Sequence, residues 1–207
     1  IIMKIGFIGC GNMGKAMIHG MIDSGKCAAS DITASVKTEK SAEECRNDLG
    51  INVTTDNISV VRSADVLFLA VKPQFFEEVI GQIKDEIADN VIIVSIAPGK
   101  ALSWFDEKFK RELKVIRTMP NTPAMVGEGM MGVCANTKVS DDELKMVEDL
   151  CSGFSKTEVV DEKLMDVVTA VSGSSPAYVF MFIEAMADAA VAVSYTHLRA
   201  HETGRNL

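Results

Sequence analysis

The chain has 207 residues, of which 47% are hydrophobic and 24% are charged, so its composition suits a packed core and not a disordered chain. The length corresponds to one full domain and part of another. A net charge of -8 and a pI near 4.9 argue against a nucleic-acid partner, whose phosphates would be repelled. The longest apolar run, near residues 91–98, is far shorter than the roughly 20 residues of a membrane span. We therefore expect no membrane partner.

The cysteine pattern indicates the compartment. Five cysteines are present, an odd number, and none has C-x-x-C spacing, so free thiols are a better interpretation than disulfides or a zinc site. Lys4 is followed by a glycine-rich turn and not by an apolar segment with a cleavage site, so no signal peptide is expected. Both observations favour a cytoplasmic protein.

An apolar strand at the start of the chain leads directly into the motif G-x-G-x-x-G, formed by Gly9, Gly11 and Gly14. Gly9 allows a tight turn, Gly11 lets a pyrophosphate approach the backbone, and Gly14 lets the next helix pack closely on the strand. The amphipathic helix that begins near Asn12 directs its free N–H groups at the same place. The motif predicts dinucleotide binding; a glycine-rich turn without a ligand is the alternative.

Apolar strands alternate with amphipathic helices after this motif. Strands are predicted at residues 31–35, 51–53, 66–71, 91–95, 113–117 and 159–160, and helices at residues 39–49, 73–87 and 140–153, the last with Ser140 and Glu143 as a capping box. This alternation predicts an α/β fold with a Rossmann-like doubly wound parallel sheet covered on both faces. Ligands of such sheets bind beyond the carboxyl ends of the strands.

The segment from Leu164 onward is long, helical, apolar and poor in charge. Such a helix should be buried, so we interpret it as the start of an all-α domain or as an oligomer interface. Small hydroxyl residues at 169–178 are predicted to lie just ahead of a helix N-terminus, which suits a carboxylate or phosphate ligand and equally suits ordinary N-capping.

The end of the second strand bears on the choice of cofactor. NAD-dependent enzymes place a carboxylate there to hold the ribose, but Asp31 begins the strand, and its exit carries Ser35 and Lys37 instead. These side chains favour NADP(H), with NAD(H) as the alternative cofactor. If no ligand binds here, the segment is simply a solvated turn. Replacing Ser35 and Lys37 together by alanine is then expected to weaken NADPH binding and to spare NADH.

Two further strand ends carry polar groups. Lys72 is expected beside the cofactor cleft, although a surface lysine is the ordinary alternative. Residues 117–123 place two prolines around an amide and a hydroxyl, and this loop either holds the nicotinamide or substrate or is a simple turn. His197 and His201 are four residues apart but lack further ligands, and no G-x-S-x-G motif is present. No metal site is predicted.

Four segments taken together carry a family resemblance: residues 6–13, 70–74, 117–123 and 169–178. In this order they closely resemble the pyrroline-5-carboxylate reductases, and the resemblance extends from Met3 to about Val191. It implies an enzyme that reduces 1-pyrroline-5-carboxylate to L-proline with NAD(P)H, the last step of proline biosynthesis. It also implies a small-molecule substrate and a homodimer or higher homo-oligomer.

The same resemblance implies site residues. Cofactor contacts are implied at Ile8, Gly9, Cys10, Gly11, Asn12, Met13, Ser35, Val36, Lys37, Asn57, Ala70, Val71, Lys72 and Pro73. Glu162 is implied on the substrate side. Ser175 stands where the family usually has glycine, which puts the detail of that turn in doubt. The substrate is expected to bind as a protonated iminium, so positioning matters more than a strong acid, and no residue is named as catalytic.

The resemblance also divides the chain. Residues 1–163 are expected to form the NAD(P)-binding Rossmann domain, and residues 164–193 the start of a helical dimerisation and substrate domain. Residues 194–207 look unlike the family. No proline follows Pro176, so the proline-glycine-glycine-threonine loop that binds the substrate carboxylate in the family is missing. We therefore expect the first two thirds of an enzyme with a foreign tail, which binds cofactor but has little or no activity by itself.

Two other functions remain open at this point. Another Rossmann reductase, of the hydroxyacid or F420-type, would share the cofactor domain but should lack the 170–178 segment. A non-catalytic module that binds NADP(H) would show cofactor binding without turnover.

Overall fold

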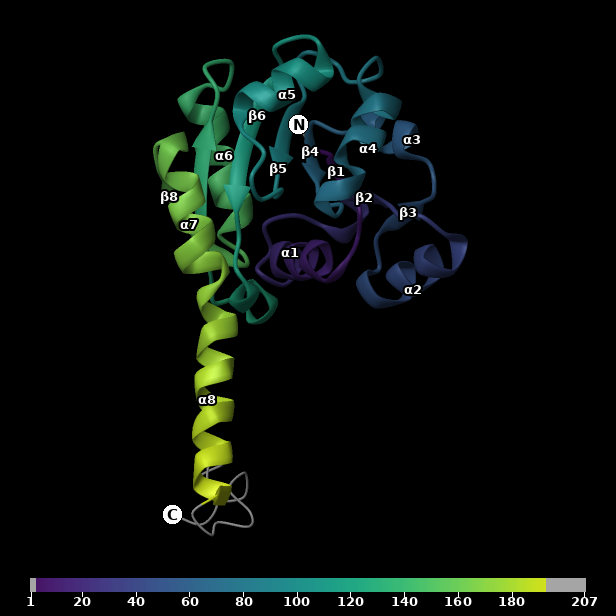
Figure 1. The fold of residues 1–207 in the computed structure, drawn as a ribbon. Helices are drawn as coiled ribbons and strands as arrows, with labels where there is room; N and C mark the ends of the chain where they lie inside the picture. Colours follow the sequence, from purple (N-terminus) through teal and green to yellow (C-terminus); the bar gives the residue numbers. More distant parts are fainter. Residues whose placement is uncertain (1–2, 193–207) are drawn as a thin grey trace.

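The computed structural model describes residues 3–192, and the expected foreign tail at 194–207 lies outside this range (Figure 1). A single sheet crosses the molecule with its strands in the order β3-β2-β1-β4-β5-β6-β7-β8. The strands are β1 (Ile5–Ile8), β2 (Ile32–Ser35), β3 (Asn52–Thr54), β4 (Val66–Leu69), β5 (Ile92–Ser95), β6 (Lys114–Met119), β7 (Gly129–Ala135) and β8 (Ser155–Val159). The first six follow the Rossmann order, so the predicted fold class is confirmed.

One strand pair departs from the predicted parallel sheet. β7 runs antiparallel to β6, with Met119 opposite Gly132, and β8 then runs parallel to β7. All other neighbouring strands are parallel. β7 was not predicted, because Val133 is its single β-branched residue and its glycines and methionines lack the alternation typical of a strand.

Helices cover both faces of the sheet. They are α1 (Asn12–Asp23), α2 (Glu39–Leu49), α3 (Asn57–Ser63), α4 (Phe76–Ile83), α5 (Leu102–Phe109), α6 (Asp141–Cys151), α7 (Met165–Val168) and α8 (Ser175–Ala192), with 3-10 turns η1 (Ala29–Asp31), η2 (Pro73–Phe75), η3 (Thr122–Val126) and η4 (Glu162–Leu164) and the π-turn η5 (Thr169–Gly173). Side chains of α1, α2 and α6 pack in one hydrophobic cluster and those of α3, α4 and α5 in another. The two clusters form the two cores.

Local sequence signals account for several helix ends. The predicted capping box of α6 is present: Ser140 Oγ accepts a hydrogen bond from Glu143 N at 3.3 Å, and Glu143 Oε2 accepts one from Ser140 N at 3.0 Å. The helix predicted over residues 73–87 is shorter, since it begins as η2 and α4 ends at Ile83. The strand predicted from residue 31 begins one residue later because Ala29–Asp31 forms η1.

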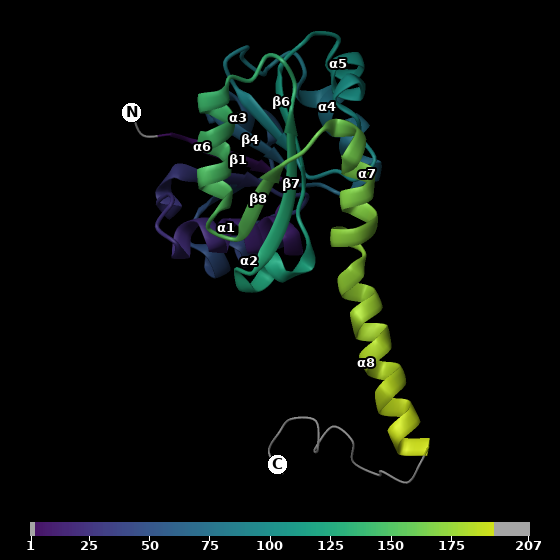
Figure 2. The ribbon, with the colours of Figure 1, turned by 90° about the vertical axis from the view of Figure 1, so that its left-hand side faces the viewer.

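The C-terminal segment forms one helix from Glu162 to Ala192 and projects away from the sheet (Figures 1 and 2). No residue of α8 is buried, and the exposed fractions of Phe180 and Phe182 are 66% and 65%. The burial expected for this segment is therefore not provided within a single chain. Its apolar side chains lack a cover among residues 3–192.

The expected helix N-terminus near residues 169–178 is also absent. Because η5 joins α7 to α8, these residues lie inside a continuous helix, and Ser174 N donates a hydrogen bond to Thr169 O at 3.1 Å. Helix N–H groups already bonded in this way cannot serve as an anion site. The hydroxyl-rich stretch is thus not an N-terminal ligand site.

The same helix is, by length and composition, apolar enough to cross a membrane, with a mean hydropathy of 1.2. The segment that most resembles a membrane span is therefore this helix and not the apolar run at residues 91–98. Glu184 and Asp188 lie within α8, and carboxylates at bilayer depth are costly. These charges favour a protein surface over lipid as the environment of the helix.

Candidate functional site: a dinucleotide cavity

A cavity of about 410 Å³ lies at the carboxyl ends of β1, β2 and β4. Its lining consists of Ile8, Gly9, Gly11, Ser35, Val36, Lys37, Thr55, Asn57, Ala70, Val71, Lys72, Phe75, Glu78, Val79 and Gln82. Ten of the fourteen residues proposed from the sequence as cofactor contacts are among them. The other four, Cys10, Asn12, Met13 and Pro73, are not among the lining residues but adjoin them in the chain. Lys72 lies beside the cleft as expected.

Five lining residues were missed: Thr55, Phe75, Glu78, Val79 and Gln82. Four of these recur every three or four residues through η2 and α4, which places them along one side of the helical segment. That spacing, starting directly after Lys72, was the available signal. The same spacing is also explained by packing on the sheet, because Val79 belongs to the buried apolar face of α4 as well as to the cavity lining.

The glycine loop between β1 and α1 has the geometry its spacing predicts. Gly9 has a φ of 95°, and a Cβ there would lie 2.8 Å from the carbonyl carbon of Ala70. A Cβ on Gly14 would lie 3.0 Å from Gly9 O. Gly11 differs, since a Cβ there would meet nothing within 4 Å. The loop therefore needs Gly9 for its backbone and leaves open space over Gly11.

The electrostatics of this loop suit an anion. Gly11 caps α1 without a side-chain hydrogen bond, and the first turn of α1 has no acidic residue, so the N–H groups there remain available. Burial raises the pKa of the Cys10 thiol to about 12. The thiol is consequently neutral at physiological pH and does not repel a phosphate. The space over Gly11 leaves the backbone there open to the approach of a phosphate.

The end of β2 carries a hydrogen-bonded set of polar side chains. Ser35, with 1% of its surface exposed, donates from Oγ to Asn57 Oδ1 at 2.6 Å. Lys37 Nζ lies 5.5 Å from the centroid of the Phe75 ring, a cation–π contact between two residues that line the cavity. Asp31 pairs with Lys4 at 2.8 Å, at the opposite end of β2. The ribose end therefore offers a cation and hydroxyl and amide groups, but no carboxylate from β2.

A second polar cluster surrounds Arg117 on β6, whose exposed fraction is 5%. Its guanidinium lies 3.4 Å from Glu162 Oε1 and 3.2 Å from Asp166 Oδ1. The same Oε1 accepts a hydrogen bond from Leu102 N at 2.6 Å, at the start of α5. Glu162 does not line the cofactor cavity. It joins β6 and α5 to the beginning of the C-terminal helix.

Two of the resembling segments meet in space although they are far apart in sequence. Asn121 Nδ2 donates to Ser172 Oγ at 3.1 Å, so the two-proline loop after β6 contacts η5. Asn121 Oδ1 also accepts from Met130 N at 2.9 Å. Within residues 3–192, no group of three or more His, Cys, Asp or Glu side chains could hold a metal ion. His197 and His201 lie outside the described residues.

The fold and this cavity define an NADP-dependent oxidoreductase of the Rossmann type. Comparisons with known proteins narrow the class. The chain is 42% identical to the pyrroline-5-carboxylate reductase of Escherichia coli over 188 residues, which are 91% of this chain and 70% of that protein. The sequence model of the pyrroline-5-carboxylate reductase dimerisation family matches residues 162–205. The chain belongs to the pyrroline-5-carboxylate reductase family.

Solved structures agree with this assignment. A Plasmodium falciparum pyrroline carboxylate reductase with NADP bound is 30% identical, with a TM-score of 0.86, and the match covers 97% of this chain and 74% of that chain. A pyrroline-5-carboxylate reductase from Coxiella burnetii is 29% identical with a TM-score of 0.88, over 97% of this chain and 74% of that one. The dimerisation match extends to residue 205 and so includes most of the segment that was expected to be foreign.

One further match concerns the alternative reductases. The family model described as NADP oxidoreductase, coenzyme F420-dependent, matches residues 4–99, which include the glycine loop and β1 to β5. The match ends before β6 and the C-terminal helix, where the pyrroline-5-carboxylate reductase match begins at residue 162. The shared part is thus the nucleotide-binding part.

Proposed function

We propose that the chain reduces 1-pyrroline-5-carboxylate to L-proline with a hydride from NADPH bound in the 410 Å³ cavity. The observation that carries this proposal is the open space over Gly11 at the uncapped start of α1, in a chain 42% identical to a pyrroline-5-carboxylate reductase. The cavity volume lies in the range of small-molecule sites. The fourteen cofactor residues named from the sequence are proposed as the contacts, together with Phe75 and Gln82.

The role of the chain's own residues follows from the substrate. A protonated cyclic imine already carries the positive charge that hydride transfer removes, so the protein must position the ring and exclude water. NADPH supplies the hydride when bound. We assign no side chain as an obligatory proton donor, since none is required on this route.

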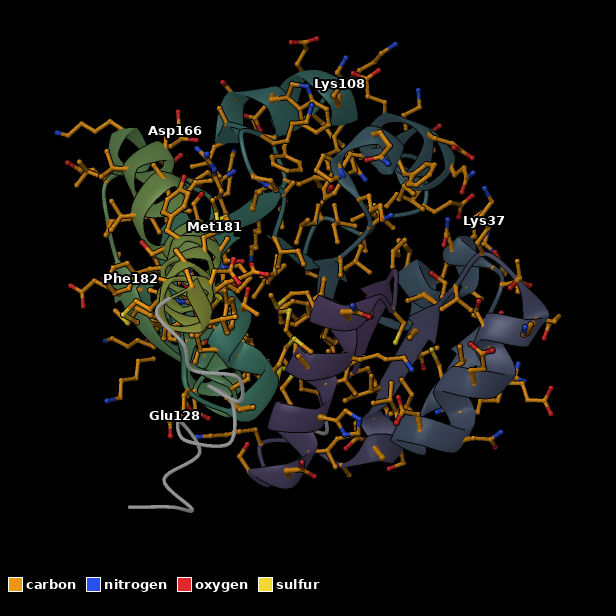
Figure 3. All side chains as sticks on the ribbon, turned by 60° about the horizontal axis from the view of Figure 1, so that its bottom comes forward. Lys37, Lys108, Glu128, Asp166, Met181 and Phe182 are labelled. Carbon is orange, nitrogen blue, oxygen red and sulfur yellow. The ribbon has the colours of Figure 1, made fainter. Side chains whose placement is uncertain are left out.

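We place Glu162 on the substrate side through its second carboxylate oxygen. Oε1 is held by Arg117 and by Leu102 N, which fixes the plane of the carboxylate and leaves Oε2 for an iminium N–H. The cluster lies beside the loop after β5, at the edge of the sheet where parallel α/β folds bind ligands. Lys37 and Asp166 lie on opposite sides of the molecule, as expected when an extended dinucleotide separates them (Figure 3).

Glu162→Gln tests this placement. It keeps an oxygen for Leu102 N but removes the negative charge, so we expect the KM for the imine to rise about tenfold or more while the Kd for NADPH stays unchanged. Steady-state kinetics would be measured on a chimera in which residues 194–207 are replaced by the corresponding C-terminal part of the Escherichia coli reductase. Asp166→Asn, which alters the other partner of Arg117, is the matched control. An unchanged KM in the Glu162 variant would contradict the role.

Lys37 is proposed as the group that selects the 2′-phosphate. The hydroxyl of Ser35 already donates a hydrogen bond to Asn57, so it is not available to a phosphate. Lys37 is then the group at this end of the cavity that can bind the 2′-phosphate. We expect Lys37→Ala to weaken NADPH binding about threefold to tenfold and to leave NADH binding nearly unchanged, because NADH lacks that phosphate. Fluorescence titration of both cofactors measures this. An equal loss for both would assign Lys37 another role.

Assembly and compartment complete the proposal. The dimerisation match and the uncovered α8 support a homo-oligomer, and we propose a homodimer or a higher assembly built through this helix. The proposed domain boundary lies at residues 163–164, within η4, next to the start of that match at residue 162. Five free cysteines among the described residues favour a reducing, cytoplasmic environment.

The remaining alternatives differ in a measurable way. A hydroxyacid or F420-type reductase would turn over a 3-hydroxyacid or a deazaflavin and not a cyclic imine. A non-catalytic NADP(H)-binding module would bind cofactor and turn over none of them, even as the chimera. The contacts of Ser172 with the loop after β6 favour the imine reductase, because they join two of the segments that carry the family resemblance.

A further inference from the structure

A chain of hydrogen bonds among residues that line the cofactor cavity joins β2 to α4. Ser35 Oγ donates to Asn57 Oδ1 at 2.6 Å, and Asn57 Nδ2 donates to Gln82 Oε1 at 2.7 Å. All three residues line the cavity, yet they come from β2, the start of α3 and the end of α4. Gln82 thus belongs to the site, although it lies outside the glycine motif and outside the segments that carry the family resemblance.

The direction of this chain is fixed at its buried end. The other acceptor near Ser35 Oγ is Phe7 O, at 3.5 Å, which is too long for a good O–H···O bond. Ser35 therefore donates to Asn57, and the Asn57 amide must present Oδ1 to Ser35. Its Nδ2 group then needs an acceptor on the far side, which Gln82 Oε1 provides.

We propose that Gln82 is a positioning residue, which holds the Asn57 amide so that its second N–H remains available to an oxygen of the cofactor ribose. An amide N has two hydrogens, and Gln82 takes one. Without the Gln82 acceptor, the Asn57 amide keeps only its Oδ1 contact with Ser35, so its Nδ2 group is no longer held in place beside the cavity. An N–H group that is not held in place gives a weaker hydrogen bond to the ribose. The proposal rests on the proposed binding of a dinucleotide in this cavity.

This arrangement predicts a dependence on the acceptor and not on side-chain size. Gln82→Met keeps the length but removes the oxygen. Gln82→Glu keeps an acceptor for Asn57 Nδ2. Because the adenosine ribose is common to both cofactors, the methionine variant should weaken NADPH and NADH alike. For the glutamate variant, the NADH affinity is compared with that of the unmodified chain. NADH is used because it lacks the 2′-phosphate, which the added negative charge would repel.

The experiment is a fluorescence titration of the full chain with NADPH and NADH, with thermal unfolding measured on each variant. We expect Gln82→Met to raise both Kd values about two- to tenfold, and Gln82→Glu to bind NADH like the unmodified chain. Gln74→Met, in η2 and not lining the cavity, is the matched control and should leave both Kd values unchanged.

Three results would overturn the proposal: unchanged Kd values in Gln82→Met, a loss confined to NADPH, or an equal loss of NADH binding in Gln82→Met and Gln82→Glu. A loss of binding that follows a lowered melting temperature would also assign Gln82 a merely structural role. Failure of the unmodified chain to bind either cofactor would instead contradict the proposed function, so the two failures are distinguishable.

Discussion

Gly11→Val is expected to lower the affinity for NADPH by well over tenfold, or more than about 1.4 kcal/mol, without unfolding the protein. A Cβ at Gly11 meets nothing within 4 Å in the protein, so valine fits the fold. The same space lies over the uncapped start of α1, where the pyrophosphate is proposed to bind. The branched side chain would occupy it. Fluorescence titration with NADPH measures the effect.

The control for this variant is Gly81→Val in α4, since a Cβ at Gly81 also meets nothing within 4 Å. It should leave NADPH affinity unchanged. Gly9→Val would not serve, because the φ of 95° and the contact with Ala70 would destabilise the loop itself. If folded Gly11→Val bound NADPH like the unmodified chain, dinucleotide binding on the glycine loop would be contradicted.

The second large effect is expected at α8. Phe182→Glu with Met186→Glu should shift the chain to the monomer, lowering its self-association constant at least about a hundredfold. Burying a large apolar side chain contributes about 1.5–3 kcal/mol, and each copy would bring two of them to the interface. The two residues are four positions apart and so lie on the same side of α8. In the single chain, the exposed fraction is 65% for Phe182 and 46% for Met186. Light scattering over a range of protein concentrations measures the mass.

The matched control adds the same charge elsewhere, with Asn47→Glu and Asn90→Glu at exposed positions. It should keep the assembly of the unmodified chain. Both double variants should bind NADPH normally, because neither pair lines the cavity. If the α8 variant kept its mass, the uncovered helix would not be the interface.

The nucleotide-binding part could be predicted from local signals. The G-x-G-x-x-G spacing implies a tight turn at Gly9 and an open backbone at Gly11; in the structure Gly9 has a φ of 95° and a Cβ at Gly11 would meet nothing within 4 Å. The absence of a carboxylate at the end of β2 could also be predicted, because it requires only the position of the strand in the sequence. Each of these features depends on residues close together in the chain, where spacing determines geometry.

Features that depend on contacts between distant elements could not be predicted. Gln82 meets Asn57 only because α4 packs beside α3. The helix N-terminus expected near residues 169–178 is absent for a different, local reason. Proline lacks the N–H that an α-helix needs, but the π-turn at η5 shifts the hydrogen bonding upstream, with Ser174 N bonded to Thr169 O. Pro176, which in the sequence looks like a first-turn proline, therefore lies within a continuous helix.

The central claim, imine reduction with NADPH, is tested most directly by steady-state oxidation of NADPH with 1-pyrroline-5-carboxylate, on the 207-residue chain and on the chimera with the Escherichia coli C-terminal part. The account predicts that the chimera oxidises NADPH only when the cyclic imine is present and forms one L-proline for each NADPH consumed. A folded chimera that binds NADPH but leaves the imine unreduced, or that acts on a 3-hydroxyacid instead, would contradict it.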